Sequence, residues 1–593
     1  MTSRRILTMA LLLGSAALGC KSEGTSGSVI PVAPSCPEGQ TCTDPNGMPT
    51  LDDPFNIPPG SGTVVIDGAG TPYQTGMNGS SAVKVDPATN AVVIDQASFG
   101  KGLGDYVWVA NSAEGTESKV DTKTMKEVAR YCTYPGCNGD PSRSTVSLLG
   151  DVVVANRANY FGINAPARAS AVKIAGDKSR CVDRNGNGQI DTFEGSGPIP
   201  AAFRWPAGAA NSPDECVLWL TQLDKDRNGN TPGGGGTLPR AAAFDSTIAD
   251  DGTPSPFVYI GLFNPNEVVR LDSKTGRILK QFLVNVRPYG FVVDKDGTLW
   301  IQGSGTLAKV DVKNNDAVTN LGGLPCAYGI SADARGYIYS SGGNCVARYN
   351  PATNTYEQIG APGFSSGRGL ALDDKYTLWV ADTGGGLYEF DASKPFGQGM
   401  TFVTSRAPRG VSFNSYYLGV SLDSANRPWI VSTGTQDLGP GGAGATGIVY
   451  NVDKPNAYTA TAVTTGNAPY TYSDMSGAQL RYAGARFGLY RHTFQSTCPA
   501  GQKTTWTQVT YDVDTPVGTT VEIRARGAGD PQALDSALFG PATAIPPAVV
   551  GPFVPNMNEG ANNTLLQLQF KLTAQNPLVT PAVKNLKANF LCG

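Results

Sequence analysis

The chain has 593 residues, with 46 Lys and Arg against 49 Asp and Glu and a formal net charge of −3. This near-neutral balance, without blocks of like charge, gives no electrostatic attraction toward nucleic acid or an anionic membrane surface. The 73 Gly and 42 Pro residues, with 40% hydrophobic content, exclude wholesale disorder and favour an all-β protein. At this length we expect about two or three domains.

The first twenty residues have the character of an export signal. Arg4 and Arg5 precede an apolar run from Ile6 to Leu18, which is shorter than the ~20 residues of a membrane-spanning helix. The run ends in Ala17-Leu18-Gly19-Cys20, which resembles the lipobox of bacterial lipoproteins, where the cysteine carries the lipid. We therefore expect a lipoprotein signal peptide at 1–20 and a protein held in the bacterial cell envelope by a lipid on Cys20, on its periplasmic or outer surface. The alternative is ordinary secretion with cleavage nearby.

Residues 21–60 are rich in Ser, Gly, Pro and Thr and show no hydrophobic periodicity, so they predict a flexible tether. Besides Cys20 the chain has ten cysteines, an even number that suits an oxidising compartment. Sequence proximity suggests the pairs Cys36–Cys42, Cys132–Cys137, Cys181–Cys216, Cys326–Cys345 and Cys498–Cys592. Other connectivities stay open at this point, and no C-x-x-C motif indicates thiol redox chemistry.

An internal repeat occupies the middle of the chain. Its frame is Gly, an apolar-rich triplet and Asp, with an aromatic residue six positions after the Asp. The copies are Gly290–Asp294 with Trp300, Gly329–Asp333 with Tyr339, Gly369–Asp373 with Trp379, and Gly419–Asp423 with Trp429. Short alternating strands joined by Asp and Gly turns at a period of about 40 residues predict the blades of a β-propeller. The repeated Asp and Gly are interpreted as turn formers rather than ligands.

Weaker copies of this repeat lie upstream, at Tyr106–Asn111, Asp151–Asn156 and Phe257–Leu262. Together they predict a seven-bladed ring over 61–465, with six or eight blades as alternatives. We expect Ala82–Asn90, which lacks the rest of a blade, to supply the strand that closes the ring.

The segment from Arg287 to Trp300 resembles the NHL and virginiamycin B lyase-like propeller group. The resemblance covers about 80–465 and implies the architecture alone, because such rings carry many functions. A lyase of this group is expected to need a histidine acid or base in the ring and bound Mg²⁺. The chain has a single histidine, His492, which lies beyond the ring and is interpreted as an ordinary strand residue.

One segment matches the 12-residue EF-hand calcium loop, running from Asp183 to Glu194. Oxygen-bearing side chains stand at positions 1, 3, 5 and 9, Gly at 6, a backbone carbonyl at 7 and a carboxylate at 12, which is the array that Ca²⁺ requires. The expected ligands are Asp183, Asn185, Asn187, Gln189, Asp191 and Glu194. Two neutral Asn ligands predict a weak site, roughly 10⁻⁴ to 10⁻³ M, of the kind that stabilises extracellular modules. The loop is expected within an insertion at 176–239, without an EF-hand exit helix because Gly and Pro follow it.

A second run repeats only the first half of this loop, with Asp224, Asp226 and Asn228 as candidate ligands. Its ninth and twelfth positions are Pro232 and Gly235, so a bidentate carboxylate is missing. We interpret it as a surface turn, with a weak second metal site as the alternative.

From about 466 the repeat disappears, but strand-like runs continue to Cys592. They predict a C-terminal antiparallel β-sandwich over 466–593, jelly-roll-like in character. The sequence as a whole favours a calcium-binding, lipid-anchored propeller that binds a protein or glycan as a surface module or scaffold. The alternative is a lyase or hydrolase, virginiamycin B lyase-like or lactonase-like, acting at the centre of the ring.

Overall fold

The computed structural model divides the chain into two units, 1–58 and 59–593. Only residues in the second unit are described: 60–77, 80–95, 103–158, 168–233, 236–247, 255–303, 305–384, 386–406, 416–432, 446–454, 458–471, 473–483, 486–545, 550–553, 555, 562–574 and 579–593. The expected signal peptide with Cys20, and the tether cysteines Cys36 and Cys42, lie outside them.

Most strands form small antiparallel sheets, each built from one consecutive stretch of chain. In chain order these sheets are β4 (Tyr106–Asn111), β5 (Thr116–Asp121), β6 (Lys126–Cys132); β7 (Pro141–Val146), β8 (Val152–Asn156), β9 (Ser170–Ile174), β10 (Val217–Gln222); β11 (Pro239–Phe244), β12 (Phe257–Leu262), β13 (Glu267–Asp272), β14 (Ile278–Leu283); β15 (Gly290–Val293), β16 (Leu299–Gly303), β17 (Thr306–Asp311), β18 (Ala317–Gly323); β19 (Gly329–Ala332), β20 (Ile338–Gly342), β21 (Cys345–Asn350), β22 (Thr355–Gly360); β23 (Gly367–Leu372), β24 (Thr377–Asp382), β25 (Gly386–Asp391), β26 (Thr401–Arg406); and β27 (Tyr417–Leu422), β28 (Pro428–Ser432), β29 (Thr446–Asp453), β30 (Thr459–Asn467).

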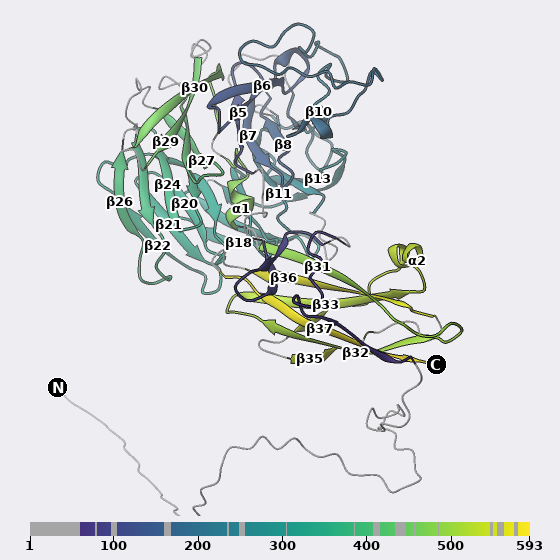
Figure 1. The fold of residues 1–593 in the computed structure, drawn as a ribbon. Helices are drawn as coiled ribbons and strands as arrows, with labels where there is room; N and C mark the ends of the chain where they lie inside the picture. The colour runs from purple at the N-terminus through teal and green to yellow at the C-terminus, as the bar shows by residue number, and fades with distance from the viewer. Residues whose placement is uncertain are drawn as a thin grey trace, which may run out of the picture. The chain divides into compact units, whose positions relative to one another are not determined.

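These sheets follow one another around a common axis. The first strands contact one another in sequence, β7 with β11, β11 with β15, β15 with β19, β19 with β23 and β23 with β27 (Figure 1). Strand β4 contacts β7, and β30 contacts β4, β5 and β6, so the last sheet meets the first. A closed succession of such sheets is the β-propeller architecture, and the predictions of an all-β chain and a propeller are confirmed.

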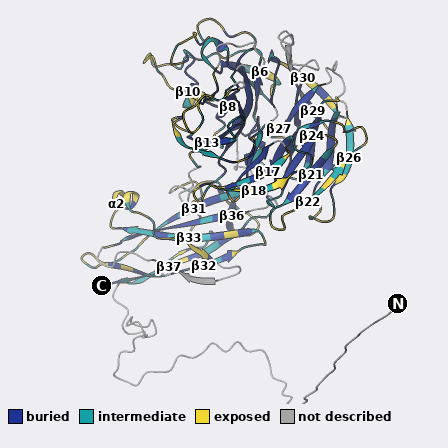
Figure 2. Ribbon diagram, turned by 180° about the vertical axis from the view of Figure 1, so that it is seen from behind, coloured by how far each residue is buried: buried dark blue, intermediate teal, exposed yellow. Residues whose placement is uncertain are grey.

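Burial falls from the axis outward within a sheet. Every residue of β19 and β27 is buried, whereas the outer strands β22 and β26 alternate exposed and half-buried residues (Figure 2). Inner strands buried on both faces carry Gly, Ala and branched apolar residues, and outer strands keep one wet face. The core therefore lies between neighbouring sheets rather than in one central layer.

The ring is closed by chain that follows β30. Ser112 donates its backbone N–H to Ala468 O (3.1 Å), Tyr470 to Ala110 O (2.8 Å) and Trp108 to Met475 O (2.8 Å). Residues 468–471 and 473–475 thus run beside β4 and extend its three-stranded sheet.

The expectation that Ala82–Asn90 closes the ring is wrong. Strand β2 (Val83–Asp86) pairs with β3 (Ala91–Ile94), and β3 pairs with β37 (Ala582–Cys592), more than 480 residues later. The alternating pattern of β2 specifies one buried face but not a pairing partner. Strands β2 and β3, which were expected within the ring, therefore pair outside it. The chain just after 466, which was expected in the sandwich, bonds to β4 of the ring.

Two sheets outside the ring contain the remaining described strands. One contains β1 (Gly62–Ile66), β2, β3, β37, β32 (Thr504–Asp514) and β35 (Val550–Phe553); the other contains β31 (Arg486–Gln495), β36 (Leu565–Ala574), β33 (Thr519–Ala528) and β34 (Thr543–Ile545). One apolar cluster takes residues from both, including Val92, Trp506 and Phe590 from the first and Tyr490 and Phe570 from the second. Figure 1 shows these strands as two layers.

Helices are few and short: α1 (Ala478–Ala483), α2 (Pro531–Ser536) and the 3₁₀ turns η1 (Pro135–Cys137) and η2 (Lys178–Arg180). Within the described ranges, no helix has the length and apolar character needed to cross a membrane.

Candidate metal centre and axial hollows

The loop that begins at Asp183 is organised by its own side chains. Asp183 Oδ1 accepts the backbone N–H of Gly186 (2.7 Å), and Oδ2 accepts that of Gly188 (2.9 Å). Both glycines have positive φ, 72° and 78°, which L side chains rarely adopt. The first carboxylate is thereby held inside a tight turn, as a loop around a small cation requires.

Three further predicted ligands converge on the same space. Asn185 Oδ1 accepts the N–H of Asn187 (3.0 Å), and Asn187 Oδ1 accepts the N–H of Gln189 (2.8 Å). The side-chain amides of Asn185 and Asn187 donate to Asp191 Oδ2, at 2.7 and 3.0 Å. These side chains carry the oxygen atoms that Ca²⁺ prefers, and in this structure the two Asn side chains turn their N–H₂ groups toward Asp191.

The twelfth position does not join them. Glu194 Oε2 lies 3.5 Å from Lys178 Nζ, and the Glu194 side chain is 65% exposed. In the described part of the chain, no three His, Cys, Asp or Glu side chains are grouped as a metal site. The structure thus brings Asp183, Asn185, Asn187 and Asp191 together and leaves Glu194 on a lysine.

Sequence reasoning missed the residue that holds the loop from outside. Glu215 is 2% exposed; its Oε1 accepts the N–H groups of Arg184 (2.6 Å) and Asn185 (3.2 Å), and its Oε2 accepts that of Asp191 (2.9 Å). The available signal was the neighbouring Cys216, whose disulfide to Cys181 starts two residues before the loop. This clamp fixes the backbone at residues 184, 185 and 191 from outside the loop.

The second run is a turn. Asp226 Oδ1 accepts the N–H groups of Asn228 (2.9 Å) and Asn230 (2.8 Å), and the backbone N–H of Asn230 is the main cause of the lowered pKa of Asp226. Asp224 pairs instead with Arg168, at 3.7 Å. The three candidate ligands Asp224, Asp226 and Asn228 are therefore not gathered around one point.

Four of the expected disulfides are formed: Cys132–Cys137, Cys181–Cys216, Cys326–Cys345 and Cys498–Cys592. In sequence, Cys132–Cys137 precedes the loop 183–194 and Cys181–Cys216 encloses it. Cys498–Cys592 joins the region before β32 to the end of β37. An exported location is consistent with such cross-links.

The axis of the ring is occupied by the chain itself. Ser473 Oγ donates to Ser144 O of β7 (2.8 Å), Ser476 Oγ to Leu422 O of β27 (2.7 Å), and Gln479 Nε2 to Ile330 O of β19 (3.1 Å). Helix α1, which carries Gln479, contacts β15, β19 and β23. Residues 473–479 therefore bridge first strands from opposite parts of the ring.

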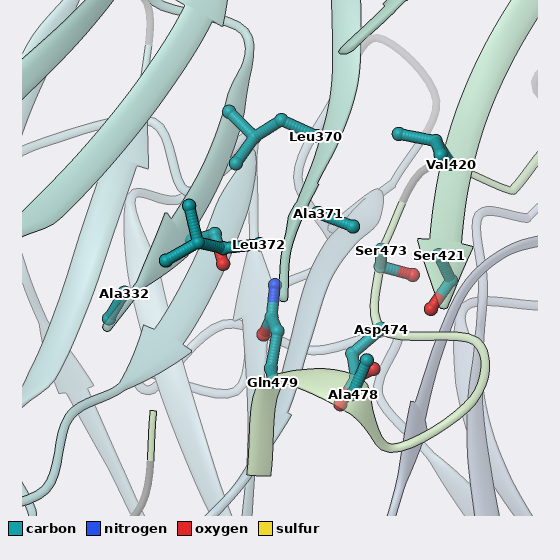
Figure 3. A pocket seen from close by; sticks show the side chains of 11 residues that line it. Ala332, Leu370, Ala371, Leu372, Val420, Ser421, Ser473, Asp474, Ala478 and Gln479 are labelled. Atoms are coloured by element: carbon teal, nitrogen blue, oxygen red, sulfur yellow. The ribbon is translucent and has the colours of Figure 1, made fainter. Parts of the chain in front are cut away.

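Among the described residues, the first strands and residues 473–479 line two small hollows of about 10 Å³ each. Figure 3 shows the first, where Gln479 and Asp474 project beside Ala332, Leu372 and Ser421. A cavity of this size holds about one water molecule. Asp474 is buried there, and its burial raises its pKa to about 7.

Arginine and tyrosine side chains gather where several first strands begin, a cluster that sequence reasoning also missed. The rings of Tyr289 and Tyr328 have centroids 5.1 Å apart, and their hydroxyls are 3.1 Å apart. The guanidinium groups of Arg143 and Arg240 lie 5.0 and 5.3 Å from the Tyr289 ring, and that of Arg368 lies 4.3 Å from the Tyr328 ring. Its only sequence signal was the Tyr or Arg that precedes the repeat glycines at 290, 329 and 369.

His492 lies away from the ring, on β31. It is 4% exposed and packs against Phe494, with ring centroids 4.9 Å apart. Burial lowers the pKa of His492 to about 4, so the imidazole is neutral at pH 7 and serves as a core side chain.

No known protein family matches the chain, and no curated protein matches it. Solved structures that resemble it include a catalytically inactive virginiamycin B lyase from Staphylococcus aureus with quinupristin (14% identity over 56% of this chain and 86% of that chain, TM-score 0.35) and a streptogramin B lyase (13% identity, 62% and 94%, TM-score 0.36). The WD40 domain of Neurospora crassa Pan2 is similar at 10% identity, over 59% of this chain and 85% of that chain, with a TM-score of 0.37. At these TM-scores the likeness supports no functional assignment.

Proposed function

We propose that this protein is an exported, lipid-anchored, calcium-binding propeller that acts as a surface binding or scaffold module of the bacterial cell envelope. In this proposal each sheet of the ring is one blade, seven in all, and the two sheets outside the ring form a jelly-roll-like antiparallel sandwich. The basic and apolar leader ending in Cys20 supports the anchor, and the disulfides support an oxidising location.

The observation that carries the choice of binding over catalysis is the filled axis. Residues 473–479 bond to β7, β19 and β27, and the axial hollows of about 10 Å³ are far below the roughly 300–1,000 Å³ of a small-molecule site. A propeller enzyme acting at its centre needs that space for substrate.

The residues available at the axis also favour binding. Among the residues that line the two hollows, Asp474 is the single carboxyl and none is a histidine. Tyr289 and Tyr328 are instead half-buried and of a residue type enriched at protein-binding hot spots. A protein or glycan ligand is therefore expected.

Calcium has a structural role in this proposal. Asp183, Asn185, Asn187, Asp191 and Glu194 would hold the ion, with the Gln189 carbonyl, and Glu194 would leave Lys178 to reach it. The ion would stiffen an insertion already clamped by Glu215 and Cys181–Cys216.

The test is a glycan array and a pull-down with the mature protein, run beside an assay for cleavage of a streptogramin B antibiotic and of a lactone. Saturable binding without turnover is expected. Turnover of either substrate would show that the axis opens to a substrate, and the lyase or hydrolase alternative would then replace the binding module.

A further inference from the structure

A cavity that lies off the axis is much larger than the two axial hollows. It has a volume of about 220 Å³ and lies between the sheet β4–β6 and the insertion that carries the calcium loop. Its polar lining comes from Tyr106, Lys119, Asp121, Tyr131, Asp177, Lys178, Thr192 and Glu194. This volume is slightly below the range of drug-sized ligands, so the cavity suits a molecule of amino-acid or monosaccharide size.

Lys119 is the polar centre of this cavity. Its Nζ donates to Gly176 O (2.8 Å) and lies 3.8 Å from the centroid of the Tyr106 ring and 5.6 Å from that of Trp108. An ammonium group has three N–H donors, and the carbonyl takes one of them. Aromatic faces attract the cation but accept no further strong hydrogen bond, which leaves donors for a ligand.

The neighbouring carboxylates have other partners. Asp177 accepts the N–H and hydroxyl of Ser179 (2.9 and 2.5 Å), and Glu194 pairs with Lys178. Asp121 accepts the N–H of Lys123 and of Thr124 in its own turn (2.9 and 2.7 Å). In the described part of the chain Lys119 forms no ion pair. Asp177, Asp121 and Glu194 raise its pKa only through their electrostatic field.

The environment penalises the charge that Lys119 carries. Burial lowers the pKa of Lys119 to about 8, despite the opposing field of Asp177. A half-buried ammonium group that no carboxylate contacts directly gains from an anion that enters the cavity and completes an ion pair.

We propose that this cavity is a binding site for a small organic carboxylate, whose carboxylate oxygens accept hydrogen bonds from Lys119 Nζ. The ligand class follows from one half-buried, partly satisfied ammonium group in a space of about 220 Å³. This site is independent of the axial function proposed above.

The test is isothermal titration of the mature protein with D-glucuronate, with D-glucose as the uncharged match, and with acetate and L-glutamate as further carboxylates. We expect at least one carboxylate to bind, and glucose to bind about tenfold more weakly or not at all. Lys119→Met should weaken carboxylate binding by about tenfold or more, while Lys123→Met, which removes an exposed lysine that pairs with Asp105 outside the cavity, should change it by less than about threefold.

A second measurement covers the case in which Lys119→Met does not fold. Amine acetylation of the wild-type protein, followed by peptide mass spectrometry, should show Lys119 protected by the bound carboxylate and the exposed Lys123 unprotected. Equal binding of glucose and glucuronate, no binding of any carboxylate, full binding by a folded Lys119→Met variant, or unprotected Lys119 would each overturn the proposal.

Discussion

Trp300 Nε1 donates a hydrogen bond to Asp294 Oδ2, at 2.7 Å, across the turn that joins β15 to β16. Trp429 donates to Asp423 in the same way (2.9 Å), and Tyr339 donates its hydroxyl to Asp333 (2.9 Å). The other oxygen of each Asp accepts backbone N–H groups two and four residues later. In these three of the four copies, Asp and the aromatic residue six positions on are therefore a bonded pair that fixes the start of the second strand in a sheet. In the fourth, Asp373 accepts the backbone N–H groups of Lys375 and Thr377, but the buried indole N–H of Trp379 does not donate to it.

Replacing Asp294 with Ala should lower the free energy of unfolding by about 2 kcal/mol, because it leaves the buried indole N–H of Trp300 and two turn N–H groups without their acceptor. Urea unfolding followed by tryptophan fluorescence measures the change. Asp296→Ala is the matched control: the Asp296 side chain is 66% exposed and pairs with Lys295, so its effect should stay within about 0.5 kcal/mol. Equal effects of the two variants would contradict the role given to the Asp–Trp pair.

Local relationships of this kind could be predicted from the sequence. The Asp and its aromatic partner are six residues apart, and Cys132 and Cys137 are five apart, so one turn or one loop brings each pair together. The blade-like strands were predicted for the same reason, since each sheet of the ring uses consecutive chain.

Long-range relationships could not be predicted in this way. Strand β1 pairs with β37 through Gly62 and Phe590, and alternation of apolar residues identifies a buried face without naming the strand beside it. The calcium motif likewise specifies residue types but not side-chain directions, so neither the contact of Glu194 with Lys178 nor the clamp by Glu215 follows from its spacing.

Calcium should raise the thermal midpoint of the wild-type protein, with half of the effect at roughly 10⁻⁴ to 10⁻³ M. Asp183→Ala should abolish this shift, because it removes the carboxylate that organises the loop. Glu194→Ala should also abolish or strongly reduce it, if calcium draws that carboxylate from Lys178 as the twelfth ligand. Thermal scans in EDTA and at increasing calcium provide the measurement.

Asp226→Ala is the control for the calcium experiment, because Asp226 caps a turn in the second run. The calcium shift should survive this substitution. A full shift in Asp183→Ala, or its loss in Asp226→Ala, would place the ion elsewhere than in the loop.

Cys20→Ser should release the protein from the membrane fraction, because a cysteine at this position is the expected lipid acceptor. Fractionation and immunoblotting of the native host, or of a bacterial expression host, give the distribution. A variant that keeps its leader but replaces Ser15 with Ala controls for changes near the cleavage site and should stay membrane-bound. Retention of Cys20→Ser on membranes would mean that another part of the chain anchors it.

The buried carboxyl of Glu117 should make stability depend on pH. It is fully buried, its Oε1 accepts the hydroxyl of Ser144 (2.8 Å), and burial raises its pKa from 4.5 to about 8. Between these two values the folded protein binds a proton that the unfolded chain does not, so this contribution to stability is fully present below pH 4.5 and is lost as the pH rises through about 8. The largest slope from one such group is about 1.4 kcal/mol per pH unit.

Glu117→Gln removes this titration while keeping an acceptor for Ser144, so the decline in unfolding free energy between about pH 5 and 8 should become shallower. Urea unfolding at a series of pH values measures the difference from wild type, in which the contributions of other titrating groups such as His492 and Asp474 cancel. Asp535→Asn is the control, because its carboxyl is 86% exposed and should leave the profile unchanged. Parallel pH profiles of Glu117→Gln and wild type would show that Glu117 ionises in the folded protein at its ordinary pKa. The burial of Glu117 on β5, against Ser144 of β7, should prevent this ionisation.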